Sequence, residues 1–110
     1  MSDVAKLNEQ LKGAQNGQLK FEALLRLKNN PDFRKVILEG FCRDECARYI
    51  VMAGDNLLDP EDRKDAKNMA MAAGHLQRFL SIQEVEGAKF KDSIEQVENE
   101  LVLARQEENL

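Results

Sequence analysis

Apolar residues recur along the chain at alternating spacings of three and four, which is the period of an amphipathic helix. The longest such pattern follows Pro60 and keeps its phase through twelve positions, ten of them apolar. A seam of more than five heptads is typical of a coiled coil and predicts one helix over residues 60–107. The twelve positions are Ala66, Met69, Ala73, Leu76, Leu80, Gln83, Gly87, Phe90, Ile94, Val97, Leu101 and Ala104.

A second interpretation breaks this helix in its middle. Ser81-Ile82-Gln83-Glu84 matches a capping box, and Gln83 and Gly87, the two seam positions that are not apolar, lie in this region. A break at Ser81–Gly87 would let residues 81–110 fold back on the domain as a hairpin. We favour the continuous helix, because a break would preserve the phase of the seam only by coincidence.

Two further helices precede this one. A seven-position stripe predicts a helix over residues 3–28 and keeps its phase through Gly13 and Gly17, where a kink is the alternative. Asn29-Asn30-Pro31-Asp32 then ends that helix and begins another over residues 31–53, with Asn30 as its N-cap. The apolar stripe of this second helix drifts around its axis. The stripe of the helix over residues 3–28 consists of Val4, Leu7, Leu11, Ala14, Gln18, Phe21 and Leu25.

Helix signals cover nearly the whole chain, so the fold is predicted to be all-α with three long helices. Val and Ile together number ten, Thr is absent, and Leu and Ala number fourteen and eleven. A chain of 110 residues has room for one helical domain. We expect an N-terminal helix in residues 1–28 and a helical hairpin core in residues 31–80, with antiparallel arms. Residues 81–110 are expected to form a projecting, acidic and coiled-coil-like C-terminal helix.

The residue types on which enzymes depend are scarce. The chain has one His, one Tyr and three Ser, so a nucleophile would have to use His75 as its base. We interpret Cys42 and Cys46 as reduced, small buried residues, with half of a metal site or a redox pair as the alternative. No glycine-rich phosphate loop is present. We therefore expect a non-enzymatic protein with no catalytic, cofactor-binding or metal site and no small-molecule substrate.

Charge is distributed unevenly along the chain. The net charge is −4, and residues 84–110 carry eight acidic but only three basic side chains. Nucleic acid is therefore not expected as a partner, because phosphate binding requires a basic face. No apolar run is long enough to span a membrane, and the start has no signal-peptide pattern, so we expect a protein that is cytoplasmic on synthesis.

The predicted seam is too long for a compact domain of this size, so its second half is expected to pair with another chain. A stripe of about seven exposed apolar positions exceeds what a soluble monomer normally tolerates. Opposite charges four residues apart also predict an ion pair between Asp44 and Arg48. The residues expected at an oligomer or partner interface are Met71, Phe90, Ile94, Val97, Leu101 and Ala104, with Arg43 and Arg48 as cationic anchors.

Three blocks of sequence carry a resemblance to a known class of proteins. They are Pro31-Asp32-Phe33-Arg34, Arg43-Asp44-Glu45-Cys46-Ala47-Arg48-Tyr49 and Gly74-His75-Leu76-Gln77-Arg78-Phe79-Leu80. In size, helix lengths and its single Cys pair, the chain resembles the short, all-helical accessory proteins encoded among the head and tail genes of tailed bacteriophages. The resemblance covers about half of the chain. It implies a role in virion assembly, as a head, connector or internal component that oligomerises. The class has no catalytic residues that could be assigned to positions of this chain.

The expected function is that of a structural or assembly protein, acting as a homo-oligomer or as a subunit of a larger particle such as a virion. Two alternatives stay open. One is a small acidic regulatory protein that binds and inhibits a host protein. The other is a small DNA-packaging subunit, which would need a basic surface assembled across several copies.

Overall fold

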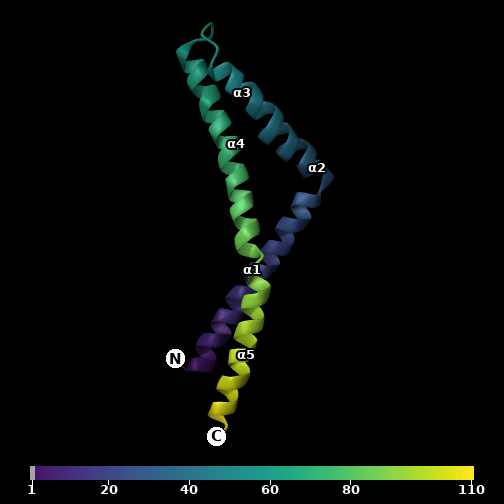
Figure 1. Ribbon diagram of the computed structural model, residues 1–110, viewed down its shortest axis with the longest axis vertical. Helices are drawn as coiled ribbons and strands as arrows, with labels where there is room; N and C mark the ends of the chain where they lie inside the picture. Colours follow the sequence, from purple (N-terminus) through teal and green to yellow (C-terminus); the bar gives the residue numbers. More distant parts are fainter. Residues whose placement is uncertain (1) are drawn as a thin grey trace. The chain divides into compact units, whose positions relative to one another are not determined.

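The computed structural model describes residues 2–110 and confirms the all-α fold with three long helical segments (Figure 1). Helices α2, η1 and α3 follow one another directly, so residues 31–53 form the predicted second segment. No strand occurs among residues 2–110. The helices are α1 (Asp3–Asn29), α2 (Pro31–Phe33), η1 (Arg34–Glu45), α3 (Cys46–Ala53), α4 (Pro60–Gly87) and α5 (Phe90–Glu108).

The chain divides into two units, each built on an antiparallel pair of helical segments. The first unit contains the N-terminal segment up to Leu25 together with Gln83–Leu110. The second unit contains Arg26–Ile82. Each unit has its own contact surface between helices, and the two surfaces differ in the side chains that form them.

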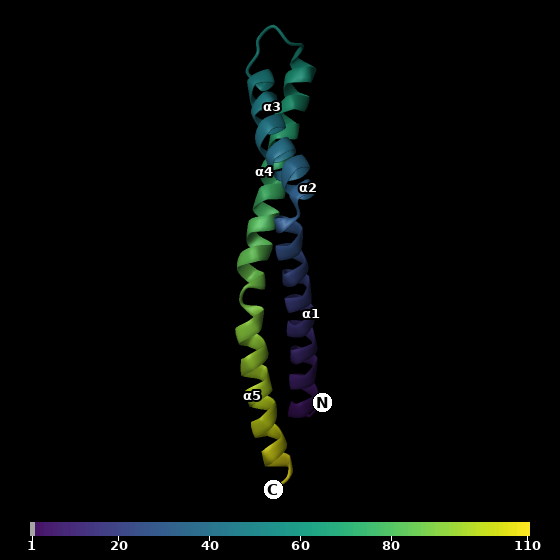
Figure 2. The same cartoon turned by 90° about the vertical axis from the view of Figure 1, so that its right-hand side faces the viewer.

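In the first unit, α1 and α5 lie side by side along the predicted seams (Figure 2). Two reciprocal contacts set their register, because Phe90 lies against Gly17 and Phe21 lies against Gly87. Leu101, further along the same seam, is only 3% exposed. The second half of the long seam therefore has a partner within its own chain. This corrects the expectation from seam length that only another chain could cover it, because α1 supplies the opposing surface.

The long C-terminal helix bends at Ala88–Lys89, between α4 and α5. The Ala88 backbone N–H still donates to the Glu84 carbonyl at 3.1 Å, as in a helix. Lys89 also keeps right-handed angles, with φ −83° and ψ −16°. The interruption is therefore a tightened turn rather than a reversal, and the seam keeps its phase through it. The alternative in which residues 81–110 fold back as a hairpin is wrong, and α1 is likewise continuous through Gly13 and Gly17.

In the second unit, the segment of residues 31–53 packs antiparallel on the first part of α4, as predicted. The Cys46 thiol donates to the Ala70 carbonyl at 3.7 Å, and Gln77 Nε2 donates to the Cys42 carbonyl at 3.2 Å. Between these two bridges, Ala73 has no exposed surface. Small side chains at this contact allow the two helices to approach closely, so little space is left for larger residues.

Residues 34–45 form a π-helix, η1, in place of the predicted α-helix. Each backbone hydrogen bond of a π-helix spans five residues instead of four, so side chains on one face recur every four to five residues. Among the shielded positions in and beside η1, which also include Leu38 and Phe41, the series Phe33, Ile37, Cys42 and Cys46 follows that spacing. This wider period accounts for the drift of the apolar stripe seen in the sequence.

The boundaries of the second segment follow the predicted capping residues. Asn30 Oδ1 accepts hydrogen bonds from the backbone N–H groups of Asp32, at 2.9 Å, and Phe33, at 3.1 Å. Pro31 occupies the first helical position, where its missing N–H costs nothing. At the other end, Gly54 follows α3 with a φ of −96°, so the helix ends there without a left-handed residue.

Candidate interaction surfaces

The core of the described chain is thin. The buried hydrophobic residues of the described chain are Ala14, Cys42, Ala66, Ala73, Leu80 and Leu101, and none of its large side chains is fully buried.

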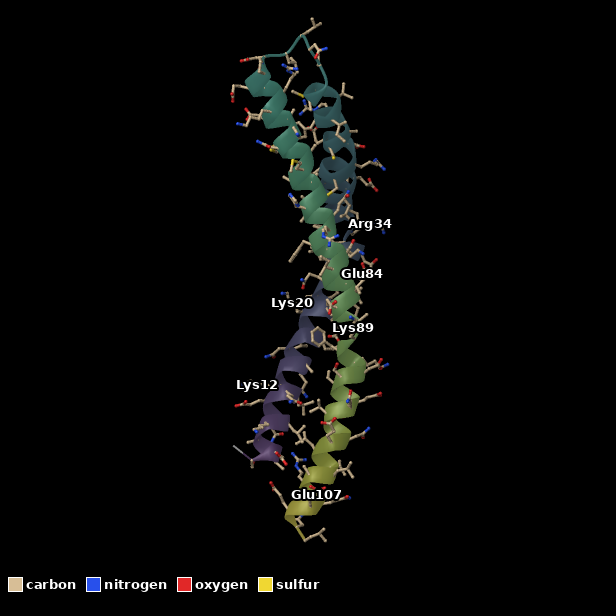
Figure 3. All side chains as sticks on the ribbon, turned by 60° about the vertical axis from the view of Figure 1, so that its left-hand side comes forward. Lys12, Lys20, Arg34, Glu84, Lys89 and Glu107 are labelled. Carbon is tan, nitrogen blue, oxygen red and sulfur yellow. The ribbon has the colours of Figure 1, made fainter. Side chains whose placement is uncertain are left out.

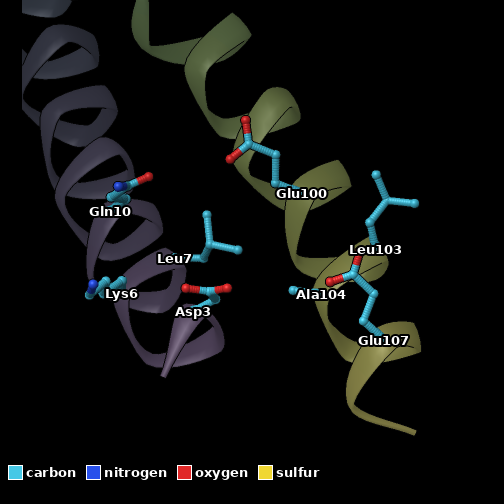
Figure 4. A pocket seen from close by; sticks show the side chains of 8 residues that line it. All are labelled: Asp3, Lys6, Leu7, Gln10, Glu100, Leu103, Ala104 and Glu107. Atoms are coloured by element: carbon cyan, nitrogen blue, oxygen red, sulfur yellow. The ribbon is translucent and has the colours of Figure 1, made fainter. Parts of the chain in front are cut away.

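One open groove runs along the first unit, between α1 and α5. Its outer part has a volume of about 390 Å³ and its inner part about 400 Å³. Both parts are lined by Gln10 and Glu100, so they form one continuous depression, the α1/α5 groove. In the outer part, Leu7 of α1 faces Ala104 of α5 (Figure 4). The apolar floor consists of Leu7, Ala14, Phe90, Val97 and Ala104.

The rim of the α1/α5 groove is acidic. Three carboxylates, those of Asp3, Glu100 and Glu107, line it against one amine, that of Lys6. All four residues are exposed, and Glu100 accepts a hydrogen bond from Gln96 of its own helix at 3.4 Å. An apolar floor with an acidic rim suits an amphipathic helix whose apolar ridge is flanked by cations.

The face of α4 opposite its buried seam is apolar and basic. Its residues recur every three or four positions, which places them on one side of the helix, while Ala66, Ala73 and Leu80 lie on the other. Met71 is 50% exposed and Ile82 42%. No acidic residue lies among these positions, and none of the three cations forms an ion pair within the described part of the chain. This surface, the α4 stripe, consists of Lys64, Lys67, Met71, His75, Arg78 and Ile82.

The interface residues predicted from the sequence fall on three different surfaces. Met71 lies on the α4 stripe. Met69, which was expected in the buried seam, is 40% exposed. Arg43 and Arg48 lie on the exposed side of the segment of residues 31–53. The five C-terminal residues, by contrast, lie in the seam with α1 inside the first unit: Phe90, Ile94, Val97, Leu101 and Ala104.

The two arginines bind neighbours on their own segment, and the predicted pair between Asp44 and Arg48 is wrong. Arg43 Nε lies 2.8 Å from Asp44 Oδ1, and Arg48 Nη2 lies 2.6 Å from Glu45 Oε2. The hydrogen bond from Arg43 lowers the pKa of Asp44, and the hydrogen bond to Glu45 raises the pKa of Arg48. The Arg48 guanidinium also stacks 4.8 Å from the Tyr49 ring centroid. Because these pairs are exposed, each contributes little to stability.

The two thiols are free, with Cys42 buried and Cys46 half-buried. No group of three or more metal-ligating side chains gathers within residues 2–110. Burial raises the pKa of the Cys42 thiol and the neighbouring Cys46 raises it further, while a hydrogen bond with Gln77 acts in the opposite direction. The site therefore disfavours the thiolate, which is the reactive form of cysteine.

Cys42 should consequently react slowly with thiol reagents. In a Cys46→Ala variant at pH 7.5, we expect maleimide to label Cys42 at least about tenfold more slowly than an unstructured cysteine. The rate should still be rising with pH above about 8.5, the usual cysteine pKa, where the labelling of an ordinary cysteine levels off. Mass spectrometry of timed samples measures the rate, and the same variant in denaturant gives the reference. Equal rates in buffer and denaturant would contradict a buried, protonated thiol.

No known family, curated protein or solved structure matches the chain. Among its described helices, none combines the length and the apolarity needed to cross a membrane.

Proposed function

We propose that the chain is a non-enzymatic structural or assembly protein that acts by helix–helix self-association. The observation that carries the proposal is the thin core: among residues 2–110, six hydrophobic residues are buried and no large side chain is fully buried. Antiparallel helix pairs leave one side of each helix uncovered, and stable helical domains cover such faces with a further layer. A second copy of the same chain can supply that layer.

The distribution of exposed apolar residues supports self-association over an isolated monomer. Leu19 and Leu103 in the first unit are 63% and 60% exposed, and Phe79 in the second is 52% exposed. Single exposed apolar residues are ordinary, but here they occur in both units beside a thin core. The seam residues of α5 support it only indirectly, since α1 already contacts them.

The setting that we propose for this role is a tailed-phage particle, with the chain as a head, connector or internal component. This part of the proposal depends on the resemblance of residues 31–80 to phage accessory proteins. Mass spectrometry of purified particles of the virus that carries the gene tests it. Several copies per particle are expected, and absence from intact particles would contradict it.

Light-scattering mass on a sizing column tests self-association directly. We expect a mass above 12.5 kDa that rises from micromolar to millimolar protein, as mass action requires. A compact 12.5 kDa particle over this whole range would contradict the proposal. Substituting Leu101 with Asp is not a clean test, because Leu101 is 3% exposed inside the first unit and its loss would unfold that unit. Surface substitutions outside the seams are needed instead.

A small acidic regulator is the second candidate, and the acidic rim of the α1/α5 groove favours it. Such a protein would be a monomer alone and would bind one basic partner protein. The same light-scattering experiment separates the two candidates, because only the assembly protein forms complexes with itself. A stable monomer would therefore redirect attention to the groove as a site for a foreign basic helix.

A further inference from the structure

The chain carries two exposed surfaces of opposite charge and similar length. The α4 stripe has three cations, Lys64, Lys67 and Arg78, around Met71 and Ile82. The α1/α5 groove has an apolar floor and a rim of three carboxylates against one amine. Neither surface is covered within its own unit, since the stripe residues and the charged rim residues are all exposed.

We infer that copies of this chain associate head to tail, with the α4 stripe of one copy seated in the α1/α5 groove of the next. This inference rests on the proposed function, because it names the surfaces through which self-association takes place. Apolar residues of the stripe contact the groove floor, and the lysine and arginine side chains reach its carboxylates. The occupant of the groove is thus a second copy, chosen by charge.

The dimensions of the two surfaces agree. From Phe90 to Glu107 the groove follows α5 for about 26 Å, at 1.5 Å per residue. From Lys64 to Ile82 the stripe extends for about 27 Å along α4. Small residues at the groove, Gly13 and Ala14 on α1, leave room for an approaching helix. Both surfaces also lie on regular helices, so little conformational entropy is lost on docking.

Charge disfavours the symmetric alternatives. Stripe against stripe would bring six cations together, and groove against groove would bring six carboxylates to one contact. Like charges placed together at an interface suppress association, whereas complementary charges favour it and fix its register. A contact between two different patches is heterologous, so each copy keeps one free stripe or groove until a ring closes or a filament grows. This property suits a component of a larger particle.

Charge reversal on either surface tests the inference. The groove variant carries Glu100→Lys and Glu107→Lys, and the stripe variant carries Lys67→Glu and Arg78→Glu. Each variant alone should self-associate at least about tenfold more weakly than the native chain, because attractive pairs become repulsive. An equimolar mixture of the two variants should regain association, because the native stripe of one variant fits the native groove of the other and the two reversed surfaces are again opposite in charge. A chain with all four substitutions should regain association, since both charge patterns are exchanged together.

Matched controls keep the change in net charge while leaving both surfaces intact. Glu95→Lys with Glu98→Lys alters α5 outside the groove. Lys12→Glu with Lys91→Glu changes cations outside the groove, and Lys12, like Lys20, points away from α5 (Figure 3). Both controls should associate within about threefold of the native chain, and circular dichroism should show unchanged helix content in every variant.

The outcomes separate this inference from the proposed function. If the native chain associates and either reversed variant associates equally well, the interface lies elsewhere and the head-to-tail inference is overturned, while self-association stands. Two weakened variants that fail to associate with each other when mixed would also overturn it. A native chain that stays monomeric removes both the inference and the proposed function. Light scattering with native mass spectrometry of the mixture distinguishes all of these results.

Discussion

Replacing Gly87 with Ala should lower the free energy of unfolding by about 2 kcal/mol, although Ala forms helix more readily than Gly by about 1 kcal/mol. A Cβ atom at this position would lie 2.3 Å from Phe21 Cδ1 and 2.8 Å from Phe21 Cβ. Rotation of the Phe21 ring alone cannot relieve this overlap, because Phe21 Cβ is fixed to the backbone. The helices α1 and α4 would have to separate locally within the first unit, and the seam beside them would lose contact.

The neighbouring glycines provide graded controls for this prediction. A Cβ at Gly17 meets the far edge of the Phe90 ring, at 2.4 Å from Cζ, so a ring rotation can relieve part of the overlap. Gly13 has no atom within 4 Å of the same position. Urea unfolding followed by circular dichroism should therefore rank Gly13→Ala as more stable than the native chain by about 0.5–1 kcal/mol. Gly17→Ala should fall between Gly13→Ala and Gly87→Ala, and a stabilised Gly87→Ala would contradict the reciprocal packing.

These glycines also show how far the sequence can predict the fold. The heptad pattern predicted the buried face of α4 and α5, including Gly87 as a seam position. Periodicity identifies which face of a helix is buried but not which element covers it. The stripe of α1 has the same period and could pair with any other seam. The contact of Phe21 with Gly87 depends on an antiparallel register that no local pattern encodes.

The π-helix was not predictable for a different reason. Hydrophobic spacing at Phe33, Ile37, Cys42 and Cys46 differs from an α-helical stripe by less than one residue per turn. A drifting α-helical stripe explains the same positions equally well. Only the backbone distinguishes them, since in η1 the Gly40 Cβ position would lie 3.1 Å from the carbonyl oxygen of Lys35, five residues earlier.

The candidate surfaces were predictable in part. The acidic charge of residues 84–110 is evident from the sequence. Met71 was predicted to face outward, and it is exposed. The groove could not be predicted, because its rim combines Glu100 and Glu107 with Asp3 of α1, and pairing between the ends of the chain was not expected. The basic residues of the stripe, Lys67 and Arg78, recur with Met71 at helical spacing. That signal was present in the sequence but was obscured by the overall negative charge.

Replacing Ala73 with Leu should destabilise the second unit by about 3 kcal/mol, near the upper end for overpacked cores. Ala73 has no exposed surface and lies between Ala70 and Gln77, whose bridges hold α4 close to the segment of residues 31–53. A leucine side chain at this position has no space without separating the helices. Separation would break the thiol bridge from Cys46 and the amide bridge to Cys42, so the two arms of the hairpin would lose their register together.

Ala72→Leu is the matched control, because it adds the same atoms one residue away on the exposed side of α4. Ala and Leu have similar helix propensity, so this variant should unfold within about 0.5 kcal/mol of the native chain. Urea unfolding of both variants measures the difference, and maleimide labelling of Cys42 reports whether the hairpin opens. We expect fast labelling only in Ala73→Leu. Equal stability of the two variants would mean that the close contact between small residues does not hold the second unit together.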